Sequence, residues 1–131
     1  MVNKVVLHLI GGKILKGTTE DFFPNKETFN VKDSKTGTNT QINFLNLKAV
    51  FFVKSFVGNP AYQEKIDAER IGFGKKIRVV FKDFETLIGY TQGFAPNRPG
   101  FIVFPADTNG NNERIFVNTK STTEVKFYEV D

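Results

Sequence analysis

The amino-acid sequence predicts a mainly β fold in which two tandem five-stranded small barrels, related by internal duplication, are joined by one short helix. Composition gives the first indication: the 131 residues include 15 Phe and no Trp, and Val, Ile and Thr stand in short runs between Gly, Asn and Pro. The apolar residues of these runs alternate with a period of two, which is typical of strands buried on one face. A repeat within the chain gives the second indication.

The repeat aligns residues 4–31 with residues 76–103 at a constant shift of 72. The matched pairs include Lys4 with Lys76, Leu15 with Leu87, Gly17 with Gly89, Phe22 with Phe94, and Pro24-Asn25 with Pro96-Asn97. After a small insertion, Val50-Phe51-Phe52 corresponds to Val125-Lys126-Phe127 at a shift of 75. Apolar alternation alone does not place Gly, Phe and Pro-Asn in register, so we interpret the repeat as a duplication.

Each half is expected to contain five strands. The predicted ranges are 4–10, 13–22, 27–33, 40–45 and 49–54 in the first half, and 76–82, 85–94, 100–105, 113–118 and 124–129 in the second. Gly11-Gly12 and Asp83-Phe84 stand where two-residue hairpin turns are expected, and Asn109-Gly110 is a further turn signal. Strands this short remove their exposed edges when they close into a small barrel.

The expected domain organisation is a first barrel over residues 1–57, a linker over 58–74 and a second barrel over 75–131. The linker contains the predicted helix, near residues 59–70. Asn59 is a suitable N-cap and Pro60 suits the first helical position. The glycines of Gly72-Phe73-Gly74 would end this helix.

The pattern Val5-x-Leu7-x-Leu9-x-x-Gly12-x-Ile14-x-x-Gly17, with Phe22 after it, resembles the first signature of the Sm-like small-barrel family. SH3-like barrels share this pattern, and Gly89-Tyr90-Thr91-Gln92-Gly93-Phe94 repeats it in the second half. The resemblance implies that Gly17 and Gly89 lie in a bent second strand, where a side chain would obstruct closure.

The resemblance does not extend to the uridine site of Sm-like proteins. In that family an Asp directly follows the Phe that matches Phe22 and Phe94, and here Phe23 and Ala95 stand at that position. Leu45-Asn46 and Asn118-Thr119 stand where its Arg-Gly pair would be. The family's uridine pocket therefore cannot be transferred to this chain.

The chain as a whole is similar to an uncharacterised bacterial domain family of unknown function, found in signalling and regulatory proteins. The similar segments are residues 55–60, 89–94, 98–101, 104–107 and 111–114.

The N-terminal apolar run ends at Gly11-Gly12, without a small-residue cleavage pattern or an 18-residue apolar span. We therefore expect a soluble, cytoplasmic protein with no membrane partner and a regulatory role.

The composition disfavours an enzyme. The chain has no Cys and His8 is its only histidine, which removes thiol nucleophiles, Cys/His zinc sites and most histidine-based triads. The acid pairs Glu20-Asp21 and Asp83/Glu85 stand at strand ends, where acids are usually turn or surface residues. We expect no catalytic residue, no metal and no cofactor.

Two kinds of ligand site are not favoured by the sequence. Asp107-x-Asn109-x-Asn111 begins like a calcium loop but lacks Gly at its sixth position and Glu at its twelfth, so a hairpin loop is the preferred interpretation. Cyclic-dinucleotide binding would require an Arg-x-x-x-Arg segment followed by Asp-x-Ser-x-x-Gly, and the chain has neither motif.

The favoured function is a non-catalytic binding or adaptor module that recognises a protein or a small ligand. The candidate contact residues lie around the second-half loops and are Tyr90, Phe94, Asn97, Arg98 and Arg114. Proline in these loops holds the backbone stiffly, as a recognition surface requires. The plain alternative is a set of well-ordered turns.

The alternative function is binding of single-stranded nucleic acid, in particular RNA. The formal net charge is +4, and the candidate basic contact residues are Lys13, Lys16, Lys75, Lys76, Arg78 and Lys82. Phe23, Phe84 and Tyr90 are candidate platforms on which bases would stack. Against this, outward lysines on strands commonly provide solubility and edge protection. His8 is expected at the surface.

Overall fold

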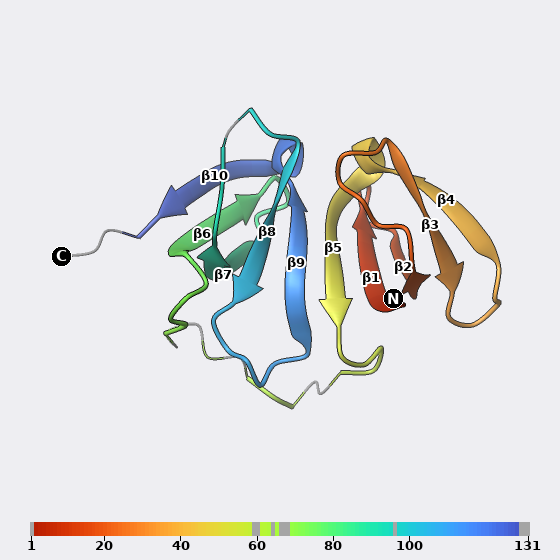
Figure 1. The fold of residues 1–131 in the computed structure, drawn as a ribbon, viewed down its shortest axis with the longest axis horizontal. Coiled ribbons are helices and arrows are strands. Elements are labelled where there is room, and N and C mark those ends of the chain that lie inside the picture. Colours follow the sequence, from red (N-terminus) through yellow and green to blue (C-terminus); the bar gives the residue numbers. More distant parts are fainter. Residues whose placement is uncertain (1, 59–60, 64, 66–68, 96, 129–131) are drawn as a thin grey trace.

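The computed structural model describes residues 2–58, 61–63, 65, 69–95 and 97–128. In chain order its strands are β1 (Asn3–Leu9), β2 (Ile14–Thr19), β3 (Thr28–Asp33), β4 (Asn39–Asn43), β5 (Leu47–Val53), β6 (Lys75–Phe81), β7 (Thr86–Thr91), β8 (Gly100–Pro105), β9 (Asn112–Asn118) and β10 (Thr122–Phe127). These strands form one open antiparallel sheet in the order β10-β6-β7-β8-β9-β5-β1-β2-β3-β4 (Figure 1). The mainly β prediction is confirmed, and the largest errors in strand bounds are at the ends of β2 and β7, which stop at Thr19 and Thr91.

The two halves repeat the same strand order. Within the first half the order is β5-β1-β2-β3-β4, and within the second half it is β10-β6-β7-β8-β9. A short 3₁₀ helix precedes the last strand of each half, η1 (Phe44–Asn46) and η2 (Thr119–Ser121). Both are capped by an asparagine side chain, because the Oδ1 atoms of Asn43 and Asn118 accept from the backbone N–H two residues later. These matched details agree with the predicted duplication.

The halves are joined edge to edge by β5 and β9. These strands pair antiparallel, with Val50 opposite Phe116 and Phe52 opposite Arg114. The outer edge of β5 is therefore occupied by a strand of the other half, and the sheet stays open with β4 and β10 as its edges. Two separately closed barrels are not confirmed.

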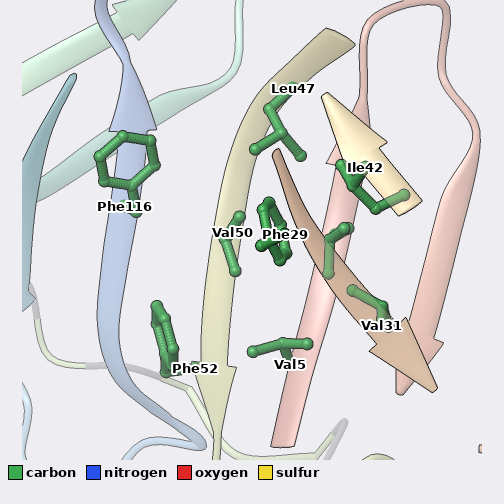
Figure 2. Packing of buried hydrophobic residues seen from close by; sticks show 9 residues of the cluster. Val5, Phe29, Val31, Ile42, Leu47, Val50, Phe52 and Phe116 are labelled. Atoms are coloured by element: carbon green, nitrogen blue, oxygen red, sulfur yellow. The ribbon is translucent and has the colours of Figure 1, made fainter. Parts of the chain in front are cut away.

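The two cores lie on opposite faces of the β5–β9 pair. Residues opposite each other in a sheet point to the same face. Val50, Phe52 and Phe116 belong to the first-half cluster, which also contains Phe29 and which Figure 2 shows between the strands. The second-half cluster takes the other face and includes Ala49, Ile115 and Val117. Each half thus covers one face of the junction and donates a side chain to the neighbouring core.

Glycine is required where the second strand of each half crosses the third. An added Cβ at Gly17 would lie 2.2 Å from the carbonyl oxygen of Lys32, and one at Gly89 would lie 2.4 Å from the carbonyl oxygen of Phe104. No side chain fits at either distance. The close approach accounts for glycine at both positions, whereas closure of a barrel, the reason that the resemblance implies, is not confirmed.

The segment before β6 is held by Asp107 and does not form the predicted helix at the described positions. The buried carboxylate of Asp107 accepts hydrogen bonds from the Tyr62 hydroxyl, from the Lys65 backbone N–H at 2.9 Å and from the Asn109 backbone N–H at 2.9 Å. In a helix the Lys65 N–H would donate to the carbonyl oxygen of Ala61. Residues 61–63, 65 and 69–70 are turn or irregular, and 59–60, 64 and 66–68 lie outside the described residues.

The same hydrogen bonds, that from the Tyr62 hydroxyl first, lower the pKa of Asp107 below its ordinary value of 3.8. Arg70 adds a second attachment, because its guanidinium lies 3.8 Å from the ring centre of Phe73 and donates to the carbonyl oxygen of Pro105 at 2.8 Å. Over the part of the chain that the structure describes, no helix has the length and apolar character needed to cross a bilayer.

Candidate functional site

Two of the predicted contact residues, Arg98 and Arg114, line one cavity of about 500 Å³. Arg98 lies in the loop before β8, and Arg114 lies on β9 two residues before Phe116, so both β9 side chains project from the same face. Ile102 on β8 is opposite Phe116 and shares that face. We call this cavity the arginine groove and define it by Pro24, Gln92, Arg98, Ile102, Arg114 and Phe116.

The arginine groove is positively charged. No Asp or Glu is among its lining residues. The ion pairs found between described residues join Lys48 to Asp83 and Glu85, and Arg78 to Glu124, and none of them involves Arg98 or Arg114. The Arg114 guanidinium lies 4.0 Å from the ring centre of the Phe52 side chain, a cation–π contact that favours this position.

A second cavity, of about 540 Å³, adjoins the arginine groove because both are lined by Pro24 and Phe116. It adds Lys26 and Glu27 from the loop before β3 and Lys120 from η2. Asn118 forms part of its wall and donates from Nδ2 to the carbonyl oxygens of Leu47 at 2.7 Å and Phe44 at 3.3 Å. These bonds cross the junction between the halves and hold the wall of the cavity in place.

The other three predicted contact residues are placed elsewhere. Tyr90 is buried, with 8% of its surface exposed. Phe94 is half-buried and packs against Phe101, at 4.8 Å between ring centres, and against Phe127 at 6.2 Å. Asn97 is exposed in the loop next to Arg98 but does not line the groove. Of the predicted set, the two arginines share the arginine groove.

The basic residues of the nucleic-acid hypothesis are spread over several surfaces. Lys13 follows the β1–β2 turn, Lys82 lies in the β6–β7 turn, and the Lys16 Nζ atom donates to the carbonyl oxygen of Phe56 at 3.1 Å. Lys75, Lys76 and Arg78 lie on β6, beside β10.

Within that β6–β10 surface, Lys75 and Lys76 lie near exposed aromatic rings. The Lys75 Nζ atom is 5.9 Å from the ring centre of Phe127, and the Lys76 Nζ atom is 4.9 Å from that of Tyr128. Arg78 instead forms an ion pair with Glu124 at 2.9 Å. This is the part of the predicted basic set that the structure combines with aromatic rings.

A third cavity, of about 430 Å³, lies between the two hairpin turns and was not predicted from the sequence. Ile10, Gly11 and Gly12 line it from the β1–β2 turn, and Lys82 and Asp83 line it from the β6–β7 turn. We call it the hairpin cavity. The sequence shows that the β1–β2 and β6–β7 turns are equivalent in the repeat. It does not show that these two turns lie close together in the folded chain.

The acid pair Asp83/Glu85 is bound to Lys48 at this cavity. The Lys48 Nζ atom lies 2.7 Å from Asp83 and 2.5 Å from Glu85. Burial opposes the charge of Lys48, but the hydrogen bonds with the two carboxylates outweigh it and raise the pKa of the lysine. These acids therefore tie the second half to β5 of the first. Among the described residues, no group of three or more His, Cys, Asp or Glu side chains could hold a metal ion.

His8 lies at the same cavity and is not the surface residue that was expected. It is half-buried, with its ring centre 4.6 Å from that of Phe51. Burial is the largest influence on the imidazole and lowers its pKa below the ordinary 6.5, although Glu85 and Asp83 act in the opposite direction.

We expect the single histidine to titrate below pH 6.5 in an NMR titration. Because the unfolded chain then binds a proton at a higher pH than the folded chain, the free energy of unfolding decreases as the pH falls below 6.5. Urea unfolding at pH 7.5 and 5.5 measures this change, and a His8→Gln variant should lose this part of the pH dependence. A midpoint at or above 6.5 would contradict the burial argument.

Comparison with known proteins places the chain in a family. A family model described as "Family of unknown function (DUF6982)" matches residues 1–128, which include both halves and the segment between them. No curated protein and no solved structure matches the chain. The predicted similarity of the whole chain to a family of unknown function is confirmed at that level.

Proposed function

Since the chain belongs to the family of unknown function DUF6982, we propose that it is a non-catalytic binding module whose arginine groove takes a ligand with an anionic group and an apolar part. The observation that carries this proposal is the placement of Arg98 and Arg114 in one cavity without an acidic lining residue. The anionic group would be a carboxylate or a phosphate, the groups that match the planar donor fork of arginine.

The surroundings of the two arginines support this ligand chemistry. Ile102, Phe116 and Pro24 give the groove an apolar wall, which would strengthen a charged hydrogen bond by excluding water. The volume of about 500 Å³ lies in the range of small-molecule sites. Pro24 comes from the first half and Arg114 from the second, so the ligand would contact both halves.

A regulatory role in the cytoplasm and an Sm-like ancestry of each half stay predictions. The close approach at Gly17 and Gly89 supports the Sm-like relationship, because it is the feature that the resemblance implies. The missing uridine residues argue that an Sm-like origin would not bring that family's RNA site with it.

The binding proposal is tested by calorimetric titration of the full chain with phenyl phosphate and benzoate, and with benzyl alcohol as the neutral match. We expect the anionic compounds to bind and the alcohol not to bind. Arg98→Gln and Arg114→Gln should each weaken binding by about tenfold or more, the value of one charged hydrogen bond. Lys126→Gln, on exposed β10, is the charge-matched control and should leave the affinity unchanged. Equal affinity in the arginine variants would contradict the assignment.

Single-stranded RNA binding is the second candidate, supported by Lys75 and Lys76 beside Phe127 and Tyr128, each of which is 41% exposed. Fluorescence anisotropy with a labelled oligouridine at about 50 and 200 mM salt measures this binding through its salt dependence. Steep weakening with salt that also requires Lys75 and Lys76, but not the arginines, would move the function to the β6–β10 surface. Oligouridine binding lost only in the arginine variants would keep it in the arginine groove.

A further inference from the structure

Phe84 occupies a position that the fold does not require to be phenylalanine. Its side chain is 86% exposed. Among the described residues, Phe84 is the one residue other than glycine with a positive φ, which is 73°. Bulky side chains rarely adopt this conformation. The counterpart of Phe84 in the first half, at the shift of 72, is Gly12, whose φ is 98°. The same turn is therefore made with glycine in one half and with an exposed aromatic residue in the other.

The Phe84 side chain makes no visible contribution to folding. Its backbone N–H closes the turn by donating to the carbonyl oxygen of Phe81 at 2.9 Å, which any residue except proline could do. Phe84 belongs to neither core cluster, and it takes no part in the ring contacts found between described residues. An exposed aromatic residue held in a strained conformation is a candidate contact for another molecule.

The neighbourhood of Phe84 combines a hollow with positive charge. Phe84 directly follows Lys82 and Asp83, which line the hairpin cavity, and Ile10 on the opposite side of the cavity is 60% exposed. Lys48 pairs with both Asp83 and Glu85, which leaves one negative charge in this group. Lys82 and Lys120 are exposed and line the cavity without an ion pair among the described residues, so that the five side chains together carry one net positive charge.

We propose that these turns dock an acidic segment of a partner protein. The hairpin surface, as we define it, consists of Ile10, Lys82, Phe84, Lys120 and the hairpin cavity between them. An apolar side chain of the partner would enter the cavity, Phe84 would enter an apolar recess of the partner, and carboxylates of the partner would lie against Lys82 and Lys120. A protein fits this surface better than a bilayer does. A cavity beside a projecting ring requires a partner with a complementary knob and recess, and a bilayer surface does not offer these.

The proposal is tested by selection from a random dodecapeptide library displayed on phage, with the full wild-type chain as bait and with Phe84→Gly kept out of the selection. We expect the enriched peptides to combine Asp and Glu with an aromatic or aliphatic residue. Synthetic copies should bind Phe84→Gly at least tenfold more weakly, and the double variant Lys82→Glu/Lys120→Glu should show a similar loss. Ile71→Ala removes an apolar residue that is 89% exposed elsewhere and should bind normally.

Folding and the arginine groove are separated from this result by two controls. Phe84→Gly should not lower the thermal midpoint, since glycine suits the positive φ of this turn. Arg98→Gln/Arg114→Gln should bind the selected peptides normally. Peptides that bind Phe84→Gly as well as wild type, or a selection without acidic enrichment, would overturn the proposal. Binding to vesicles of phosphatidylcholine and phosphatidylserine that depends on Phe84, with no selected peptide, would overturn it in favour of a membrane surface.

Discussion

Phe116→Ala is expected to lower the free energy of unfolding by about 3–5 kcal/mol, the usual result of removing a buried phenylalanine. Phe116 is 4% exposed and lies on β9 of the second half, but its ring packs in the first-half core, 5.3 Å from Phe22 and 5.8 Å from Phe44 between ring centres. Its loss leaves a cavity in one core and weakens the junction between the halves. Urea unfolding followed by circular dichroism measures the change.

Two variants control this prediction. Phe116→Leu keeps most of the apolar volume and should cost less than about 1.5 kcal/mol. Gln41→Ala changes the residue that corresponds to Phe116 in β4 at the shift of 75, which is exposed, and should change stability by no more than about 0.5 kcal/mol. A loss below about 1 kcal/mol for Phe116→Ala would show that the halves do not depend on the contact across β5 and β9.

Gly89→Ala is expected to lower the free energy of unfolding by about 3 kcal/mol, which is the upper end of the usual cost of adding a methyl group to a tightly packed position. The added methyl group would lie 2.4 Å from the Phe104 carbonyl oxygen and 2.7 Å from the Val103 Cγ1 atom, so backbone must move. β7 pairs with β8 only at Gly89 and Tyr90, and the movement would disrupt that short pairing.

Gly93→Ala is the matched control for Gly89, because the nearest atom to its added Cβ is the Arg98 Nη1 atom at 3.8 Å. We expect this control to be within about 0.5 kcal/mol of wild type. Gly17→Ala should reproduce the loss from the first half, since its added Cβ would lie 2.2 Å from the Lys32 carbonyl oxygen. Similar stabilities for Gly89→Ala and Gly93→Ala would refute the close approach of β7 and β8.

Much of the fold could be predicted because it depends on local patterns. Alternating apolar residues and glycine turns identify all ten strands, and the repeat assigns them to two halves. The open sheet could not be predicted in this way, because pairing of β5 with β9 joins segments far apart in the sequence. A signal was present: Ile115 and Phe116 are apolar on both faces of β9, whereas their counterparts in β4 are Thr40 and Gln41.

The linker helix shows the opposite case, in which a local signal is overruled. Asn59-Pro60 favours a helix start, but the Lys65 N–H donates to Asp107, a residue on the other side of β6, β7 and β8 in the sequence. A contact of this kind is invisible to capping rules.

The candidate site was only partly predictable. Arg98 and Arg114 line one cavity because a loop and a strand of one half lie next to each other. Tyr90 was expected at a contact surface, but 8% of its surface is exposed. Apolar alternation in β7 identifies the face that points to the core, and it does not show whether the other face of the strand is covered as well. The hairpin cavity depends on the packing of two turns from different halves, for which no sequence rule exists.

The arginine groove is proposed as a ligand site, and binding there can be observed at its own side chains. The most direct measurement is an NMR titration of the full chain with phenyl phosphate, following the side-chain Nε–H resonances of its arginines. We expect the resonances of Arg98 and Arg114 to shift together and to saturate at the same ligand concentration, and that of Arg78, paired with Glu124, to stay in place. Stationary Arg98 and Arg114 resonances at saturating ligand would contradict it.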